Sequence, residues 1–128
     1  MLEKLLTANR IKTGLVVADW EELVEEVGAI MVDAGDTEHT YTVAMKEVIK
    51  EMGPYCVIAP GVALLHARPE AGVKRLCIAL VKLKKGIDFG SVNDPVFLAF
   101  GLGAVDGESH IALLARIADL LQNKEQVQ

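Results

Sequence analysis

Two segments in the first half of the chain carry apolar residues at helical spacing. The first begins at Asp19 and ends at Gly35, and the second runs from Thr37 or Thr40 to Met52. One face of each segment is apolar, with Trp20, Leu23, Val24, Val27, Ile30 and Met31 in the first and Tyr41, Ala44, Met45, Val48, Ile49 and Met52 in the second. Both segments are therefore predicted to be helices that cover a core.

The middle of the chain has short apolar runs that lack a polar face. They cover residues 55–59, 62–67, 75–84 and 96–100, and a shorter run, 15–17, precedes the first helix. Runs of this length, separated by Pro, Gly and charged residues, are typical of strands that are buried on both faces. We expect the run at 75–84 to be a central strand.

A last helix is predicted to begin at Asp106, whose carboxylate can accept a hydrogen bond from the backbone of Ser109. His110 follows in the first turn, and the apolar residues that we expect on its face are Leu114, Ile117, Ala118 and Leu121. The polar residues 122–128 are expected to fray. The order strand, two helices, several strands and helix predicts an α/β fold over residues 1–128, a single-domain layered fold with a mixed β-sheet flanked by α-helices.

Composition narrows the class of protein. The chain has 128 residues and is 52% hydrophobic, which suits one domain with one core. No apolar run reaches the roughly 20 residues that cross a bilayer, and the N-terminus does not resemble a signal peptide, so we expect a cytoplasmic protein. The net charge is -5, and the basic segment between Lys74 and Lys85 is short and lacks aromatic residues. We therefore expect no nucleic acid partner.

The two cysteines, Cys56 and Cys77, lie far apart within apolar runs. We expect them to be buried free thiols, and we expect no metal site. Sequence patterns of serine hydrolases and of dinucleotide-binding proteins are also missing or incomplete.

The candidate chemistry centres on His66, at the end of the apolar run 62–67, and on His110. A neutral imidazole is a good nucleophile near pH 7 and can carry a phosphoryl group as a covalent intermediate. Arg68 could supply positive charge, and backbone N–H groups near Ser109 could bind the phosphoryl oxygens. The residues alone leave a second role open, in which both histidines serve only in packing.

Four stretches of the chain resemble the IIA domain of the bacterial phosphoenolpyruvate-dependent sugar phosphotransferase system. They cover residues 53–73, 83–90, 93–96 and 104–110, and they include Ala-Pro-Gly followed by His-x-Arg-Pro, and a later Val-Asp-x-x-x-His. The resemblance is to the mannitol/fructose-type family, and within it the ascorbate class is most similar.

This resemblance implies a phosphoryl relay. The carrier protein HPr would donate a phosphoryl group to His66, with His110 as the second active-site histidine. His66 would pass the group to a cysteine of a IIB component, and a membrane IIC component would couple it to uptake of an ascorbate-, pentitol- or mannitol/fructose-like sugar. Arg68 and Ser109 are the candidate phosphate-binding residues, and no cofactor is expected.

The chain departs from the family pattern in three ways. Leu65 stands where the family usually has a proline, which either loosens the backbone at His66 or adds a ladder bond to the strand. Val48 and Lys50 lie near the position at which the mannitol-like branch has an arginine, so Arg68 is the better candidate cation. Family members usually continue into a further C-terminal helical segment, so we expect this sequence either to be cut short or to be a minimal member with a partly exposed face. Such a face could pair two copies as a homodimer.

Two alternatives to a transport role stay open at this point. The chain could be a regulatory module whose phosphorylation changes a protein contact. It could also be an inactive domain, which would be supported by a fully buried His66 more than about 8 Å from His110, since hydrogen-bonded partners lie near 3 Å.

Overall fold

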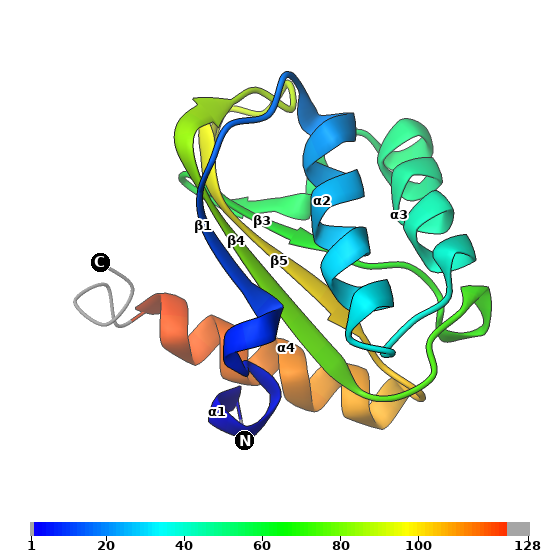
Figure 1. The fold of residues 1–128 in the computed structure, drawn as a ribbon. Coiled ribbons are helices and arrows are strands. Elements are labelled where there is room, and N and C mark those ends of the chain that lie inside the picture. Colours follow the sequence, from blue (N-terminus) through cyan, green and yellow to red (C-terminus); the bar gives the residue numbers. More distant parts are fainter. Residues whose placement is uncertain (1, 123–128) are drawn as a thin grey trace.

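The strands of the protein form one mixed sheet with helices on both faces (Figure 1). The computed structural model describes residues 2–122. Within this range the strands are β1 (Ile11–Leu15), β2 (Val57–Ala59), β3 (Val62–Leu65), β4 (Cys77–Ile87) and β5 (Val96–Gly103). The α-helices are α1 (Leu2–Leu5), α2 (Trp20–Asp33), α3 (His39–Met52) and α4 (Gly107–Gln122), and the 3-10 turns are η1 (Ala8–Arg10), η2 (Pro54–Cys56) and η3 (Pro69–Ala71).

The sheet has the order β1-β4-β5-β3-β2, so the late strand β5 lies at its centre. Strand β5 runs parallel to β3 and antiparallel to β4, while β1 is parallel to β4 and β2 is antiparallel to β3. The predicted α/β layered fold with a mixed sheet is therefore confirmed, and β4 is an internal strand as expected.

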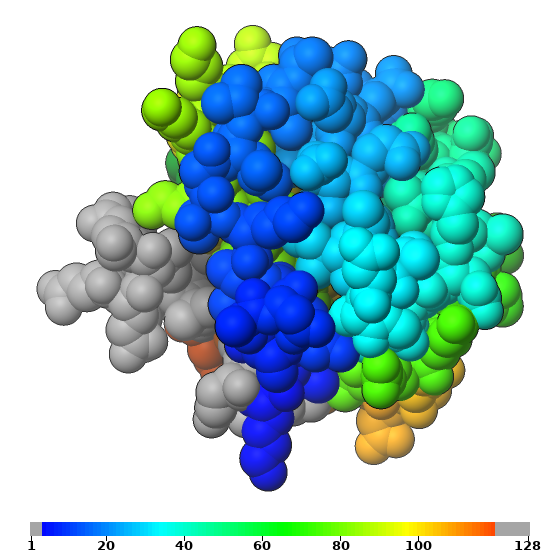
Figure 2. Space-filling model, in the orientation of Figure 1, coloured from blue at the N-terminus to red at the C-terminus, as the bar shows by residue number. Residues whose placement is uncertain are grey.

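Helices α2 and α3 cover one face of the sheet, and α4 covers the other (Figure 1). Alternate residues of β3 divide between these layers, because successive side chains of a strand point to opposite faces. Ala63 and Leu65 pack in the cluster with α2 and α3, whereas Val62 and Leu64 pack with α4. In the space-filling view, the blue to cyan atoms of β1, α2 and α3 hide most of the sheet (Figure 2).

The predicted start of α2 and the predicted C-terminal ends of α2 and α3 are confirmed, while α3 begins at His39. The Asp19 carboxylate caps α2 by accepting a hydrogen bond from the backbone N–H of Glu22 at 2.9 Å. Gly35 follows the helix with a φ of 77°, a left-handed conformation that glycine adopts without strain. Helix α3 ends at Met52, and Gly53 follows it, also with positive φ.

Strand boundaries differ from the predicted ones. The strand expected at 15–17 is wrong, because the chain pairs with β4 at residues 11–15 instead. This edge strand is mostly exposed, so it lacks the apolar pattern that marks the buried strands. The run at 55–59 begins as a 3-10 turn, and the run at 62–67 ends as a strand at Leu65, which places His66 just beyond the ladder.

The last helix begins as predicted, but its buried face is shifted. Leu113 and Ile117 are buried against the sheet, whereas Ala118, which we expected to point inward, is exposed. The side chain of Leu121 and the residues 123–128 expected to fray lie outside the described part of the chain. Among the helices of residues 2–122, none is long and apolar enough to cross a membrane.

An ion cluster around the buried Asp36 joins the turn η1, the loop after α2 and the segment before β4. The carboxylate of Asp36, whose side chain is 1% exposed, accepts hydrogen bonds from Arg10 Nε at 2.7 Å and Nη2 at 2.9 Å, and from Arg75 Nε at 2.8 Å. Arg75 Nη2 also donates to the carbonyl of Ala34 at 2.8 Å. Burial alone would raise the pKa of Asp36, but the hydrogen bonds from the two arginines hold it below its usual range.

Candidate active site

His66 lies at the carboxyl end of β3, one residue past the last strand residue, Leu65. Its place in the alternation of β3 puts it on the face that α4 covers, with Val62 and Leu64. Leu65, which replaces the usual proline of the family, pairs with Gly101 of β5. The strand therefore keeps its ladder up to the residue that precedes His66.

His110 reaches the same place from the start of α4. The helix is capped by Asp106, whose Oδ1 accepts from the backbone N–H of Ser109 at 2.7 Å and whose carbonyl accepts from the N–H of His110 at 3.1 Å. Because β3 and β5 are parallel, the end of β3 and the loop from β5 to α4 meet at one edge of the sheet. The ring centroids of His66 and His110 are 5.2 Å apart, with an interplanar angle of 49°.

The environment of His66 favours its neutral form. The side chain is half-buried, and its Nδ1 is a buried atom without a hydrogen-bond partner among the described residues. Burial lowers the pKa of His66, and the neighbouring His110 lowers it further, while the backbone of Leu64 partly offsets both effects. A neutral ring keeps the nitrogen lone pair that a nucleophile requires. The arrangement that would support an inactive domain, with the two histidines far apart, is not found.

The other two predicted site residues, Arg68 and Ser109, lie close to the histidines in sequence but differ in their hydrogen bonds. Arg68 is exposed, two residues after His66, and its side chain forms no hydrogen bond or ion pair with the side chains that the structure describes. The backbone N–H of Ser109, which we expected to face a phosphoryl group, is occupied by the Asp106 carboxylate. The Arg68 guanidinium is therefore available for an incoming anion, and the Ser109 amide is used by the helix cap.

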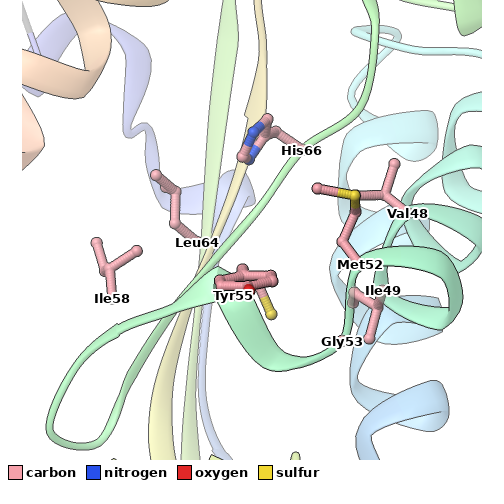
Figure 3. A pocket seen from close by; sticks show the side chains of 9 residues that line it. Val48, Ile49, Met52, Gly53, Tyr55, Ile58, Leu64 and His66 are labelled. Atoms are coloured by element: carbon pink, nitrogen blue, oxygen red, sulfur yellow. The ribbon is translucent and has the colours of Figure 1, made fainter.

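An apolar pocket of about 160 Å³ adjoins His66. Val48, Ile49 and Met52 of α3 form one side of it, and Ile58 and Leu64 face them (Figure 3). Its remaining lining residues are Gly53, Tyr55, Cys56 and His66. The apolar side chains at its rim are unusually exposed, with Tyr55 at 79%, Met52 at 58% and Ile58 at 46%. An exposed apolar patch of this kind is typical of a protein docking surface.

The thiol of Cys56, in the same pocket, has its pKa raised to about 11 by burial. Burial likewise raises the pKa of the Cys77 thiol to about 12. Both cysteines are free, as predicted, although Cys56 is only half-buried. Neither thiol is in the thiolate form that cysteine nucleophiles use near neutral pH.

One residue that contacts the site was missed in the sequence. Tyr41 was predicted only as part of an apolar helix face, yet its hydroxyl bonds to the backbone of Ala67, the residue after His66. The signal was available in principle, because a tyrosine on a buried helix face needs a hydrogen-bond partner for its hydroxyl. The identity of that partner could not be read from the sequence.

Comparison with known proteins assigns the chain to a family. A family model described as "Phosphoenolpyruvate-dependent sugar phosphotransferase system, EIIA 2" matches residues 4–128. The mannitol-specific cryptic phosphotransferase enzyme IIA component of Escherichia coli K12 is 35% identical over 107 residues, covering 84% of this chain and 73% of the relative. The ascorbate-specific EIIA component of the same organism is 38% identical over 108 residues, covering 83% and 70%.

Solved structures agree with this assignment. A solution structure of the mannitol-specific cryptic enzyme IIA from Escherichia coli has a TM-score of 0.88 at 31% identity, covering 98% of this chain and 86% of that one. The complex of the mannitol enzyme IIA with phosphorylated enzyme IIB from Escherichia coli has a TM-score of 0.79 at 24% identity, covering 92% and 83%, and at that identity shows the fold alone.

The family match and the fold thus place the chain among the phosphotransferase components that serve sugar transport. The chain belongs to the EIIA 2 family of the phosphoenolpyruvate-dependent sugar phosphotransferase system, and the resemblance seen in the sequence is confirmed.

Proposed function

We propose that this IIA component accepts a phosphoryl group from phospho-HPr on His66 and passes it to a cysteine of a IIB component. The membrane IIC component would then couple the relay to uptake of a sugar of the ascorbate, pentitol or mannitol/fructose kind. The observation that carries the proposal is the pair of imidazoles, 5.2 Å apart, at the end of β3 and the start of α4. The proposed relay, which takes its phosphoryl group from enzyme I through HPr, would run in the cytoplasm.

The buried Nδ1 indicates which nitrogen of His66 reacts. Because Nδ1 is shielded by protein, we assign the nucleophile to Nε2, with the ring proton on Nδ1. The Nε2 lone pair forms the new N–P bond, while the donor histidine nitrogen keeps the electron pair of the N–P bond that breaks. In the second transfer the IIB thiolate attacks phosphorus, and Nε2 of His66 recovers its lone pair.

The neighbouring residues have distinct proposed roles. His110 donates a hydrogen bond to the equatorial phosphoryl oxygens, where charge must be stabilised in the transition state. Arg68 supplies positive charge from an exposed side chain two residues after His66. Ser109 can contribute only its hydroxyl, and only when that hydroxyl turns away from the Asp106 carboxylate, because its amide caps α4. Binding through so few groups suits a carrier, because a tightly held phosphoryl group would not leave again.

The apolar pocket is the proposed contact for the protein partners. HPr and IIB must both bring a reactive side chain to His66, so both must cover the same surface in turn. The exposed Met52, Tyr55 and Ile58 supply apolar area beside the reactive ring.

The relay can be tested with phosphoenolpyruvate, enzyme I and HPr as the phosphoryl source. We expect the protein to gain an acid-labile phosphoryl label, and His66→Ala to gain none. His39→Ala is the matched control, because His39 is exposed in the first turn of α3 and should leave labelling unchanged. Label retained by His66→Ala would contradict the assignment.

A second stage separates the transport role from regulation. Addition of a IIB component should discharge the label onto its cysteine. A stable phosphoprotein that donates to no IIB, yet changes the binding of another protein, would favour the regulatory alternative.

A further inference from the structure

The hydroxyl of Tyr41 lies between the ends of two strands. Tyr41 is in the first turn of α3 and is 1% exposed, which makes it one of the largest fully buried side chains of the described residues. Its hydroxyl oxygen accepts from the backbone N–H of Ala67 at 2.9 Å. The same oxygen lies 2.5 Å from the carbonyl oxygen of Leu102 and 3.2 Å from that of Ala67. With one proton to donate, the hydroxyl bonds to Leu102, the closer acceptor.

These contacts replace one rung of the sheet. The β3–β5 pairing is parallel and ends at Leu65 with Gly101, so the same register would align Ala67 with Gly103. In a parallel ladder the N–H of Ala67 would then bond directly to the carbonyl of Leu102. The hydroxyl of Tyr41 occupies that bond, because it accepts from the first group and donates to the second. The hydroxyl links the two strand ends, and because it is inserted between them it also keeps them farther apart than a direct bond would.

The bridged residues belong to the two segments that carry the histidines. Ala67 follows His66 directly, and Leu102 lies near the end of β5, whose continuation forms the first turn of α4 with His110. Strand β3 ends at Leu65, and the next element, η3, begins at Pro69. No strand pairing therefore holds the chain just beyond His66. The phenol also stays protonated at working pH, since burial raises the pKa of Tyr41 to about 12.

We propose, on the basis of the proposed phosphoryl transfer, that Tyr41 is a positioning residue that fixes the His66 imidazole relative to His110 by bridging the amide of Ala67 and the carbonyl of Leu102. It touches neither the phosphoryl group nor the partner protein. Its loss lets the strand ends close into a direct bond or separate, and either movement displaces His66.

The test compares Tyr41→Phe with Thr42→Val. Thr42 is the next residue of α3, is 2% exposed, and has a buried hydroxyl without a partner, so Thr42→Val removes an equally buried hydroxyl that bridges nothing. Phosphoryl acceptance is measured over a range of phospho-HPr concentrations, and the ring protons of His66 and His110 are titrated by NMR.

We expect Tyr41→Phe to lower kcat about tenfold or more, since small misplacements of a reacting group are costly, and to leave KM for phospho-HPr unchanged. We also expect the pKa of His66 to rise toward its usual value as the ring becomes better hydrated. Thr42→Val should change neither quantity. Equal kcat and equal His66 titration in Tyr41→Phe and the wild type would overturn the proposal, whereas a loss of stability alone would show a structural role.

Two further measurements test the proposal if the variant does not fold or if the wild type accepts no phosphoryl group. If Tyr41→Phe does not fold, hydrogen exchange of the wild-type Ala67 amide decides, because a bridged amide must be protected and rapid exchange would refute the bridge. If the wild type accepts no phosphoryl group, the proposed function fails, but the His66 titration in Tyr41→Phe still reports on positioning.

Discussion

The Asp36 cluster and the His66–His110 pair are both polar groups at the margin of the core, and they are built in opposite ways. The buried carboxylate of Asp36 accepts three hydrogen bonds from two guanidinium groups, so its charge is compensated. Among the described residues His66 instead has a buried nitrogen without a hydrogen-bond partner, and the neighbouring His110 disfavours its charged form.

The difference separates stability from reactivity. A satisfied ion cluster lowers the energy of one arrangement of the loops and offers nothing to a ligand. An under-satisfied imidazole makes a smaller contribution to stability but keeps a lone pair available, which is why perturbed titrating groups gather at functional sites. The following predictions test this contrast.

The largest effect on stability is expected from Asp36→Ala. Removing the carboxylate leaves two guanidinium groups without their partner, and one of them, on Arg10, is only 16% exposed. We expect a loss of about 3 kcal/mol in the free energy of unfolding, measured by urea denaturation. Glu26→Ala is the control, because its 4.0 Å pair with Lys12 is exposed and should contribute less than about 0.5 kcal/mol. Equal losses in the two variants would contradict the contrast.

The pH dependence of stability should follow the same cluster. The pKa of Asp36 is lower in the folded protein than in the unfolded chain, so its contribution is full above about pH 4 and is lost as the pH falls through the folded value. Urea denaturation from pH 6 to pH 3 should therefore show a shallower decline for Asp36→Asn than for the wild type. Some decline should persist, because the pKa values of Asp94 and Asp106 are also lowered. Parallel curves for both proteins would refute the prediction.

At the histidine pair, His110→Ala should raise the pKa of His66, because one of the two effects that lower it is removed. Phosphoryl acceptance should slow by roughly tenfold or more. It should slow further at pH 6 than at pH 8, because only the neutral ring reacts. NMR titration of His66 and initial rates at both pH values measure the two effects, with His39→Ala as control. An unchanged or lowered His66 pKa would show that the rings are not coupled.

The smallest effect on the fold is expected from Arg68→Ala. The side chain is exposed, so the free energy of unfolding should change by less than about 0.5 kcal/mol. Phosphoryl acceptance should become slower and less sensitive to salt, because an attractive charge is lost. Lys85→Ala removes an exposed charge from β4 and should leave the rate unchanged. A marked loss of stability in Arg68→Ala would instead show that this arginine stabilises the folded protein.

The parts of the fold that the sequence predicts are those with local signals. Helix α2 follows from its apolar period and from the Asp19 cap, and the apolar run at 62–67 puts His66 at the end of a buried strand. Strand β1 could not be found in this way, because it is mostly exposed and is defined by pairing with β4, far along the chain. The same holds for Tyr41, whose role depends on how two distant strand ends approach each other.

Resemblance to a family does not by itself show which of the matching residues react and which shape the fold. Residues 93–96 are one of the four stretches that resemble the family, but the Asp94 carboxylate accepts backbone hydrogen bonds from Phe89, Gly90 and Ser91. Asp94 therefore shapes the turn between β4 and β5, at the opposite end of β5 from the histidines.

Because β5 lies at the centre of the sheet, the site around His66 can form only late during synthesis. His66 is translated before β5, which must lie beside β3, and before α4, which supplies the ring of His110. A nascent or prematurely terminated chain thus exposes an isolated histidine without its counterpart. Under the proposed relay, only finished molecules would draw phosphoryl groups from the carrier pool.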